Sequence, residues 1–106
     1  MAIVRGRSMR PLLVEGDRLL VHHGADVRPG VLVLARFPDG TLAVKRAIDE
    51  RRTASGRAGW WLLSENPEEG VDSRHRGPVP VEDVLAVAVA RLWPRPGLLL
   101  GPLRRR

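Results

Sequence analysis

The stretch VLVLARF-PDG-TLAVKRAI, residues Val31 to Ile48, decides the fold. Its first part, Val31 to Phe37, is strongly apolar, and Pro38-Asp39-Gly40 is typical of the turn in a β-hairpin. The segment therefore predicts two antiparallel strands, Val31 to Phe37 and Thr41 to Ile48. Lys45 lies in the middle of the second strand.

Outward from this hairpin, the chain consists of short apolar segments separated by turn residues, without a sustained helical period. Further strands are expected at Ala2 to Arg5, Arg18 to His22, Gly59 to Ser64 and Val84 to Leu92. A loop from Glu65 to Pro80 should precede a short helical turn near Val81 to Asp83, and Trp60 and Trp61 should point to opposite faces. Strands this short and numerous predict a mainly β fold, a coiled, barrel-like sheet with few short helical turns.

The length of 106 residues predicts one domain over residues 1–106, with residues 94–106 forming a tail rich in Pro, Leu and Arg. Three prolines argue against a regular element in this tail, although Leu98, Leu99 and Leu100 could cover an apolar surface.

The chain has no cysteine, which excludes disulfides and Cys-ligated zinc. We find no apolar run long enough for a membrane span and no secretory signal, so the expected location is cytoplasmic.

The charge is strongly basic, with 18 Lys and Arg against 12 Asp and Glu and a net charge of +6. Such an excess can mark a protein that binds nucleic acid. However, 17 of the 18 basic residues are Arg, and three of these end the chain at Arg104 to Arg106. The composition favours Arg wherever a positive charge suffices, so we do not expect nucleic acid as a partner.

The single lysine, Lys45, is the exception to this preference. Arg keeps its proton in proteins, whereas a buried Lys can lose one. Strand alternation places Lys45 on the same face as Ala43 and Ala47, and this apolar environment disfavours the charged amine. A neutral lysine can act as a general base for a serine nucleophile. The alternative is that one Lys persists by chance.

Four serines are available, at positions 8, 55, 64 and 73. Ser8 lies in Gly6-Arg7-Ser8-Met9-Arg10-Pro11, directly after the first expected strand. Such a junction can expose a hydroxyl together with free backbone N–H groups, which could stabilise an oxyanion. Because serine is common in turns, this segment becomes informative only in combination with the other motifs.

The motifs in chain order are Gly6-x-Ser8-Met9-x-Pro11, Gly16-Asp17, Val44-Lys45-Arg46, and Asp72-Ser73-Arg74 followed by Gly77 and Val79-Pro80. Together they resemble the type I signal peptidase family of Ser-Lys proteases. The short chain and the stretch Trp60 to Pro67 look most like the branch that matures nickel-type superoxide dismutase. The sequence departs from the family at Leu12, where Thr is frequent, and at Ser64-Glu65-Asn66, which stands in place of Gly-Asp-Asn.

The resemblance implies a role for each matching residue. Ser8 would attack the scissile carbonyl, and Lys45 would take its proton and pass it to the leaving amine. The backbone N–H of Ser8 would be one oxyanion donor, but Gly6 replaces a hydroxyl residue of some members, so a second donor is unassigned. No metal and no cofactor is implied.

Supporting roles follow from the same resemblance. Met9 would support the nucleophile and shape the substrate pocket, and Ser73 would hydrogen-bond the lysine amine and orient it. Asp72 would pair with Arg46 or Arg74 and hold its loop.

The main functional prediction is an endopeptidase that removes an N-terminal extension from a precursor protein, such as that of a nickel superoxide dismutase. Two alternatives remain. One is a self-cleaving regulator of the LexA type, and the other is a non-catalytic, arginine-rich domain that binds nucleic acid.

Overall fold

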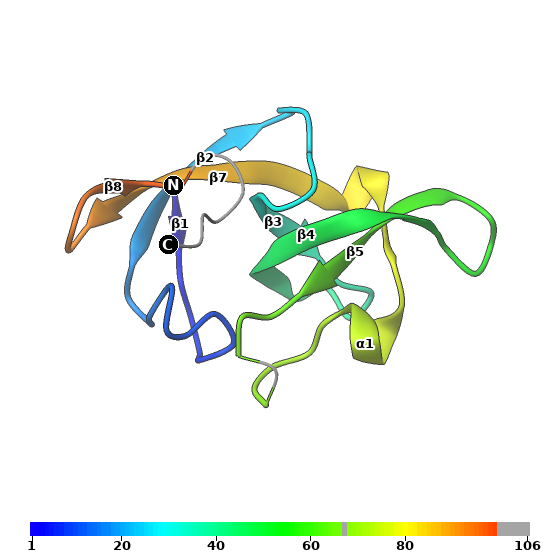
Figure 1. Cartoon of the computed structure of the whole chain (residues 1–106), viewed down its shortest axis with the longest axis horizontal. Helices are drawn as coiled ribbons and strands as arrows, with labels where there is room; N and C mark the ends of the chain where they lie inside the picture. Colours follow the sequence, from blue (N-terminus) through cyan, green and yellow to red (C-terminus); the bar gives the residue numbers. More distant parts are fainter. Residues whose placement is uncertain (67, 100–106) are drawn as a thin grey trace.

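The computed structural model describes residues 1–66 and 68–99, which form a strongly coiled antiparallel sheet (Figure 1). The strands are β1 (Ala2–Ile3), β2 (Arg18–His23), β3 (Leu32–Arg36), β4 (Leu42–Arg52), β5 (Ala58–Leu63), β6 (Val79–Pro80), β7 (Val84–Trp93) and β8 (Gly97–Leu98). One helical turn, α1 (Ser73–Arg76), and one 3-10 turn, η1 (Val81–Asp83), accompany them. The sheet order is β1-β2-β7-β3-β4-β5-β6, and β8 pairs with β7. The prediction of a mainly β fold is confirmed.

The central hairpin forms as predicted, because β3 and β4 pair from Leu32 opposite Arg46 to Arg36 opposite Leu42. β4 continues to Arg52, four residues beyond the predicted end. The sequence turns polar after Ile48, but this second half of the strand pairs with β5. On its exposed side, the Arg51 guanidinium lies over the Trp61 ring at 4.2 Å from the ring centre.

Three short elements were not predicted. α1 and β6 lie within the expected loop from Glu65 to Pro80, and β8 lies in the Pro-rich tail. β8 forms because its two residues, Gly97 and Leu98, reach Arg91 and Ala90 of β7. Leu98 is exposed, whereas Leu99 packs against the core. Leu100 lies outside the described residues.

Two apolar clusters fill the two sides of the coiled sheet. The first is built around Val33, Phe37, Trp60 and Leu62, and the second around Met9, Leu13, Leu19, Leu32 and Val44. Trp60 is buried in the first cluster while Trp61 is partly exposed, so the two rings face opposite sides as predicted.

The loop between β1 and β2 is closed at its base and packed at its centre. The N–H of Val4 donates to the carbonyl of Asp17 at 2.9 Å, and the N–H of Gly16 donates back to Val4 at 2.8 Å. Asp17 is buried and also forms an ion pair with Arg91 of β7 at 3.1 Å. Met9 anchors the loop in the second cluster. The loop therefore holds the half-buried Ser8 in a defined position.

Candidate active site

Ser8 lies in the loop between β1 and β2, immediately before the buried Met9. The loop turns tightly here, since the N–H of Arg10 donates to Arg7 O at 3.1 Å and that of Leu13 to Met9 O at 2.9 Å. Gly6 has a positive φ of 76°, a conformation that side chains rarely adopt. The anchored Met9 thus holds the half-buried Ser8 at the edge of a cavity.

Lys45 lies in the middle of β4, opposite Val33 of β3, and is only 2% exposed. Its neighbours on the same face, Ala43 and Ala47, pack with the first cluster, while Val44 belongs to the second. The predicted alternation is therefore present. Burial lowers the pKa of the Lys45 amine, Asp72 opposes this shift, and the positive charge of Arg74 adds to it. The net effect favours the neutral amine.

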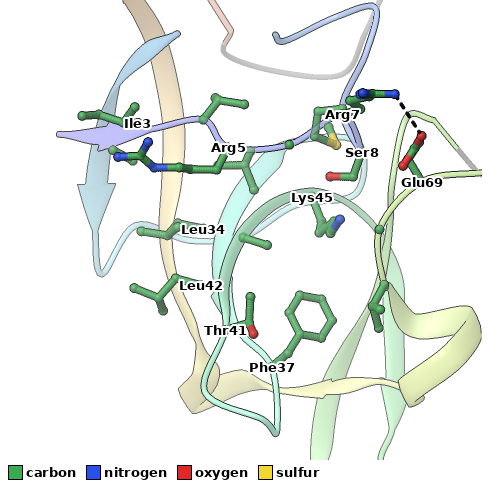
Figure 2. A pocket seen from close by; sticks show the side chains of 18 of the residues that line it. Ile3, Arg5, Arg7, Ser8, Leu34, Phe37, Thr41, Leu42, Lys45 and Glu69 are labelled. Atoms are coloured by element: carbon green, nitrogen blue, oxygen red, sulfur yellow. Dashed lines mark ion pairs between the residues drawn. The ribbon is translucent and has the colours of Figure 1, made fainter. Parts of the chain in front are cut away.

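Ser8 and Lys45 line the same cavity, which has a volume of about 620 Å³. Figure 2 shows the hydroxyl and the amine close together at one end of it. A Cβ atom placed on Gly70 would lie 3.5 Å from Ser8 Oγ and 3.3 Å from Lys45 Nζ, so both atoms approach one point. In the described part of the chain, no hydrogen bond joins them directly. Such bonds often tighten only when substrate is bound.

The hydroxyl that contacts the amine is that of Ser64, not Ser73. Lys45 Nζ donates to Ser64 Oγ at 2.9 Å. Ser73 is buried at the start of α1, and its Oγ accepts the N–H of Leu62 at 2.9 Å. The hydrogen bond to the amine that was expected of Ser73 is therefore made by Ser64 in this structure.

Strand register explains this correction. Arg46 pairs with Leu63 across the β4–β5 ladder, so one further step brings the residue after Leu63 beside Lys45. Ser64 is that residue. The sequence carries a signal for this contact, since Ser64 stands where the resembled family has glycine, but the strand register is needed to interpret it.

Asp72 holds the loop that follows β5. It is fully buried, pairs with the Arg74 guanidinium at 2.6 Å, and accepts the N–H of Ser64 at 2.9 Å. Burial alone would raise the pKa of this carboxyl, but the hydrogen bonds from Arg74 and Ser64 lower it well below its usual range. Asp72 thus fixes the backbone of the residue that contacts the lysine.

Of the two partners expected for Asp72, the structure selects Arg74. Arg46 projects to the opposite face of β4 from Lys45, where it pairs with Glu65 and donates to Gly30 O at 2.6 Å. Arg46 therefore ties the start of the β5–α1 loop to the turn before β3, and among the described residues it forms no hydrogen bond or ion pair with Asp72.

Met9 has both of the properties considered for it. Its side chain is 2% exposed and packs in the second cluster, and it also lines the cavity. Its Sδ accepts the N–H of Glu65 at 3.4 Å. Asn66, to which the motifs assigned no role, donates its backbone N–H to Ser8 O at 2.7 Å. The Asn66 contact ties the β1–β2 loop to the β5–α1 loop.

The walls of the cavity come from residues 1–9, from the β3–β4 hairpin, and from residues 69–71. Figure 2 shows Leu34, Phe37 and Leu42 away from the hydroxyl and the amine, and an ion pair between Arg7 and Glu69 at the rim. The cavity is therefore mainly apolar with a polar end, which suits a ligand with apolar side chains.

A family model described as "Peptidase S24-like" matches residues 1–76, a segment that contains Ser8, Lys45 and Ser64. The chain belongs to the Peptidase S24-like family. The match supports a peptidase. It leaves the finer assignment suggested by the motifs, to the type I signal peptidases, as a proposal.

The chain is also similar to three curated proteins, two of which are protease subunits. The chain is 32% identical over 60 residues to mitochondrial inner membrane protease subunit 1 of Schizosaccharomyces pombe, covering 57% of this chain and 38% of that protein. It is 39% identical over 66 residues to the LexA repressor of Ectopseudomonas mendocina, covering 61% and 29% respectively. The Xenopus tropicalis mitochondrial inner membrane protease subunit 1 is 26% identical over 123 aligned residues, covering 96% and 72%.

The first two alignments span well under half of those relatives' own length. No solved structure matches the chain. None of the helices formed by the described residues is both long and apolar enough to cross a membrane.

Proposed function

We propose that this peptidase is a serine endopeptidase in which Ser8 and Lys45 form a catalytic dyad. The observation that carries the proposal is the placement of a buried, hydrogen-bonded lysine amine and a loop serine hydroxyl at the same end of one cavity. The chain has one lysine, and burial lowers the pKa of its amine.

The reaction follows from these positions. Ser8 Oγ attacks the carbonyl carbon of the scissile bond while neutral Lys45 Nζ accepts the hydroxyl proton. The backbone N–H of Ser8 donates to the oxyanion that develops. The protonated amine then gives its proton to the leaving nitrogen, and the C–N bond breaks. A water molecule, deprotonated by the same amine, hydrolyses the acyl ester and restores Ser8.

The substrate would bind as an extended segment beside β4. The β4–β5 ladder begins at Arg46, so residues Leu42 to Lys45 pair with β3 alone among the described strands. Their other edge lies at the cavity, and an extended peptide can pair with such an edge through its main chain. Alternate side chains of the peptide would then enter the apolar space near Leu34 and Phe37.

The proposed substrate is a precursor protein that loses an N-terminal extension, with the precursor of a nickel-type superoxide dismutase as the first candidate. This choice rests on the motif resemblance described above. The metal would belong to the substrate, and the proposed place of action is the cytoplasm.

A second candidate is a self-cleaving regulator, which the similarity to the LexA repressor favours. Under this alternative the substrate is a segment of the same polypeptide. A cut in the purified protein whose rate does not depend on protein concentration would support it over the first candidate.

The test incubates the purified chain with a candidate dismutase precursor and identifies the new N-terminus by mass spectrometry. Ser8→Ala and Lys45→Arg should each reduce cleavage by about 1,000-fold or more. Ser55→Ala is the matched control, because Ser55 is exposed in the β4–β5 turn and contacts Thr53. Full activity of Lys45→Arg would refute the dyad, since Arg cannot act as the neutral base.

A further inference from the structure

The loop between β5 and α1 contacts both members of the proposed dyad. At its start, Ser64 Oγ accepts the bond from Lys45 Nζ. Two residues later, the N–H of Asn66 donates to Ser8 O at 2.7 Å. These contacts bring the base and the nucleophile loop against one connecting segment.

Gly70, later in the same loop, leaves no room for a side chain beside the dyad. A Cβ atom at this position would lie 2.7 Å from Ser8 Cβ, a separation that real Cβ atoms do not show. The same atom would lie 3.5 Å from Ser8 Oγ and 3.3 Å from Lys45 Nζ. Gly70 also has a φ of +76°, so two separate features of the backbone require glycine here.

Comparison with Gly56 separates the effect of the positive φ from the effect of the close approach to Ser8. Gly56, in the β4–β5 turn, has a φ of +84°, but a Cβ atom there would meet nothing within 4 Å. A side chain at position 56 would therefore introduce backbone strain alone. A side chain at position 70 would introduce the same strain together with a collision at Ser8.

We propose that Gly70 is a positioning residue that sets the separation between Ser8 Oγ and Lys45 Nζ. The inference rests on the proposed function, because it assigns these two atoms to the reaction. A methyl group at position 70 must either push Ser8 away from the amine or occupy the space through which the proton passes. Displacement of reacting groups by about 1 Å is enough to lower a rate by about 100-fold.

The first experiment compares Gly70→Ala with Gly56→Ala in the precursor cleavage assay. We expect Gly70→Ala to lower kcat by about 100-fold with KM changed less than about threefold, because the loss lies in the chemical step. Gly56→Ala should keep the wild-type kcat. If the kcat of Gly70→Ala stays within about threefold of that of Gly56→Ala, the proposal is wrong.

A second experiment detects the contact without measuring activity. Both alanine substitutions are placed in the wild-type chain and in a Ser8→Gly background, which removes the colliding Cβ, and thermal unfolding is recorded for each. Gly70→Ala should melt roughly 5 °C or more below Gly56→Ala in the wild-type chain, and the difference should largely vanish with Ser8→Gly. Equal melting temperatures in both backgrounds would overturn the proposal.

This comparison also covers a variant that does not fold. If Gly70→Ala folds only in the Ser8→Gly background, the collision with Ser8 is established. If it fails in both backgrounds while Gly56→Ala folds in both, the crowding does not involve Ser8 and the proposal falls.

Failure of the proposed function has a different signature. It would appear as absence of cleavage by the wild-type chain, or as cleavage that survives Ser8→Ala. The melting comparison would still decide whether Gly70 and Ser8 are in contact, and loss of that contact would refute the positioning role whatever the substrate.

Discussion

The amine of Lys45 donates a 2.9 Å hydrogen bond to Ser64 Oγ across the end of the β4–β5 ladder. This contact orients the only lysine of the chain toward the cavity where Ser8 lies. Burial of the amine lowers its pKa, and the hydroxyl supplies an acceptor that limits its rotation. The chemistry of the proposed site therefore depends on a residue that lies 19 positions away in sequence.

Cleavage should become faster as the pH rises. The amine must be neutral to accept the Ser8 proton, and its pKa lies below the ordinary 10.5, so the active fraction grows as pH approaches and passes the lowered value. A profile of kcat/KM against pH should show this ascending limb and then level off. A rate that is constant between about pH 6 and 10 would contradict a lysine base.

Folding stability should also rise with pH because of Lys45. Its folded pKa is lowered, so between that value and 10.5 the unfolded chain binds more protons than the folded one, and stability increases with pH. Lys45→Met, which keeps an apolar side chain of similar length, should remove this contribution. Urea unfolding from pH 8 to 10.5 measures the difference, and parallel curves for the two proteins would show that the amine titrates normally.

Ser64→Ala should lower the rate of cleavage, whereas Ser73→Ala should lower the stability of the fold. Loss of the Ser64 hydroxyl leaves the Lys45 amine without its acceptor, so cleavage should fall by about 10- to 100-fold. Loss of the Ser73 hydroxyl leaves the buried N–H of Leu62 unpaired, which should lower the free energy of unfolding by about 1–3 kcal/mol.

Steady-state kinetics and urea unfolding of both variants check this contrast. Ser64→Thr, which keeps a hydroxyl, should restore much of the rate. A rate loss confined to Ser73→Ala would instead support the assignment made from sequence.

Asp72→Asn should destabilise the protein above about pH 4. The pKa of the Asp72 carboxyl is lowered by Arg74 and Ser64, so its contribution is present above the ordinary value of 3.8 and is lost as the pH falls through the lowered one. We expect the free energy of unfolding to fall by about 1–3 kcal/mol at neutral pH, because the neutral amide accepts weaker hydrogen bonds than the buried carboxylate does. Asp26→Asn is the control, because Asp26 is exposed. Equal stability of the two variants at pH 7 would contradict the structural role of Asp72.

Much of the β fold could be predicted because its signals are local. The Val31–Ile48 segment carries both strands and the turn of the central hairpin. In the structure, both ends of β3 and the start of β4 lie one residue from their predicted positions. β4 extended further than predicted because pairing with β5 stabilises a polar segment that alternation alone would exclude. β8 escaped prediction for the same reason, since contact with β7 outweighed the surrounding prolines.

By itself, the sequence determined that one lysine lies in the middle of an apolar strand and that a serine follows the first strand, because strand alternation and turn chemistry act over a few neighbouring residues. Only the tertiary structure decided that Ser64 rather than Ser73 meets the amine and that a side chain at position 70 would collide with Ser8. Those contacts depend on the register between β4 and β5 and on the path of the loop after β5. Both result from packing between residues far apart in the chain, which spacing in the sequence does not encode.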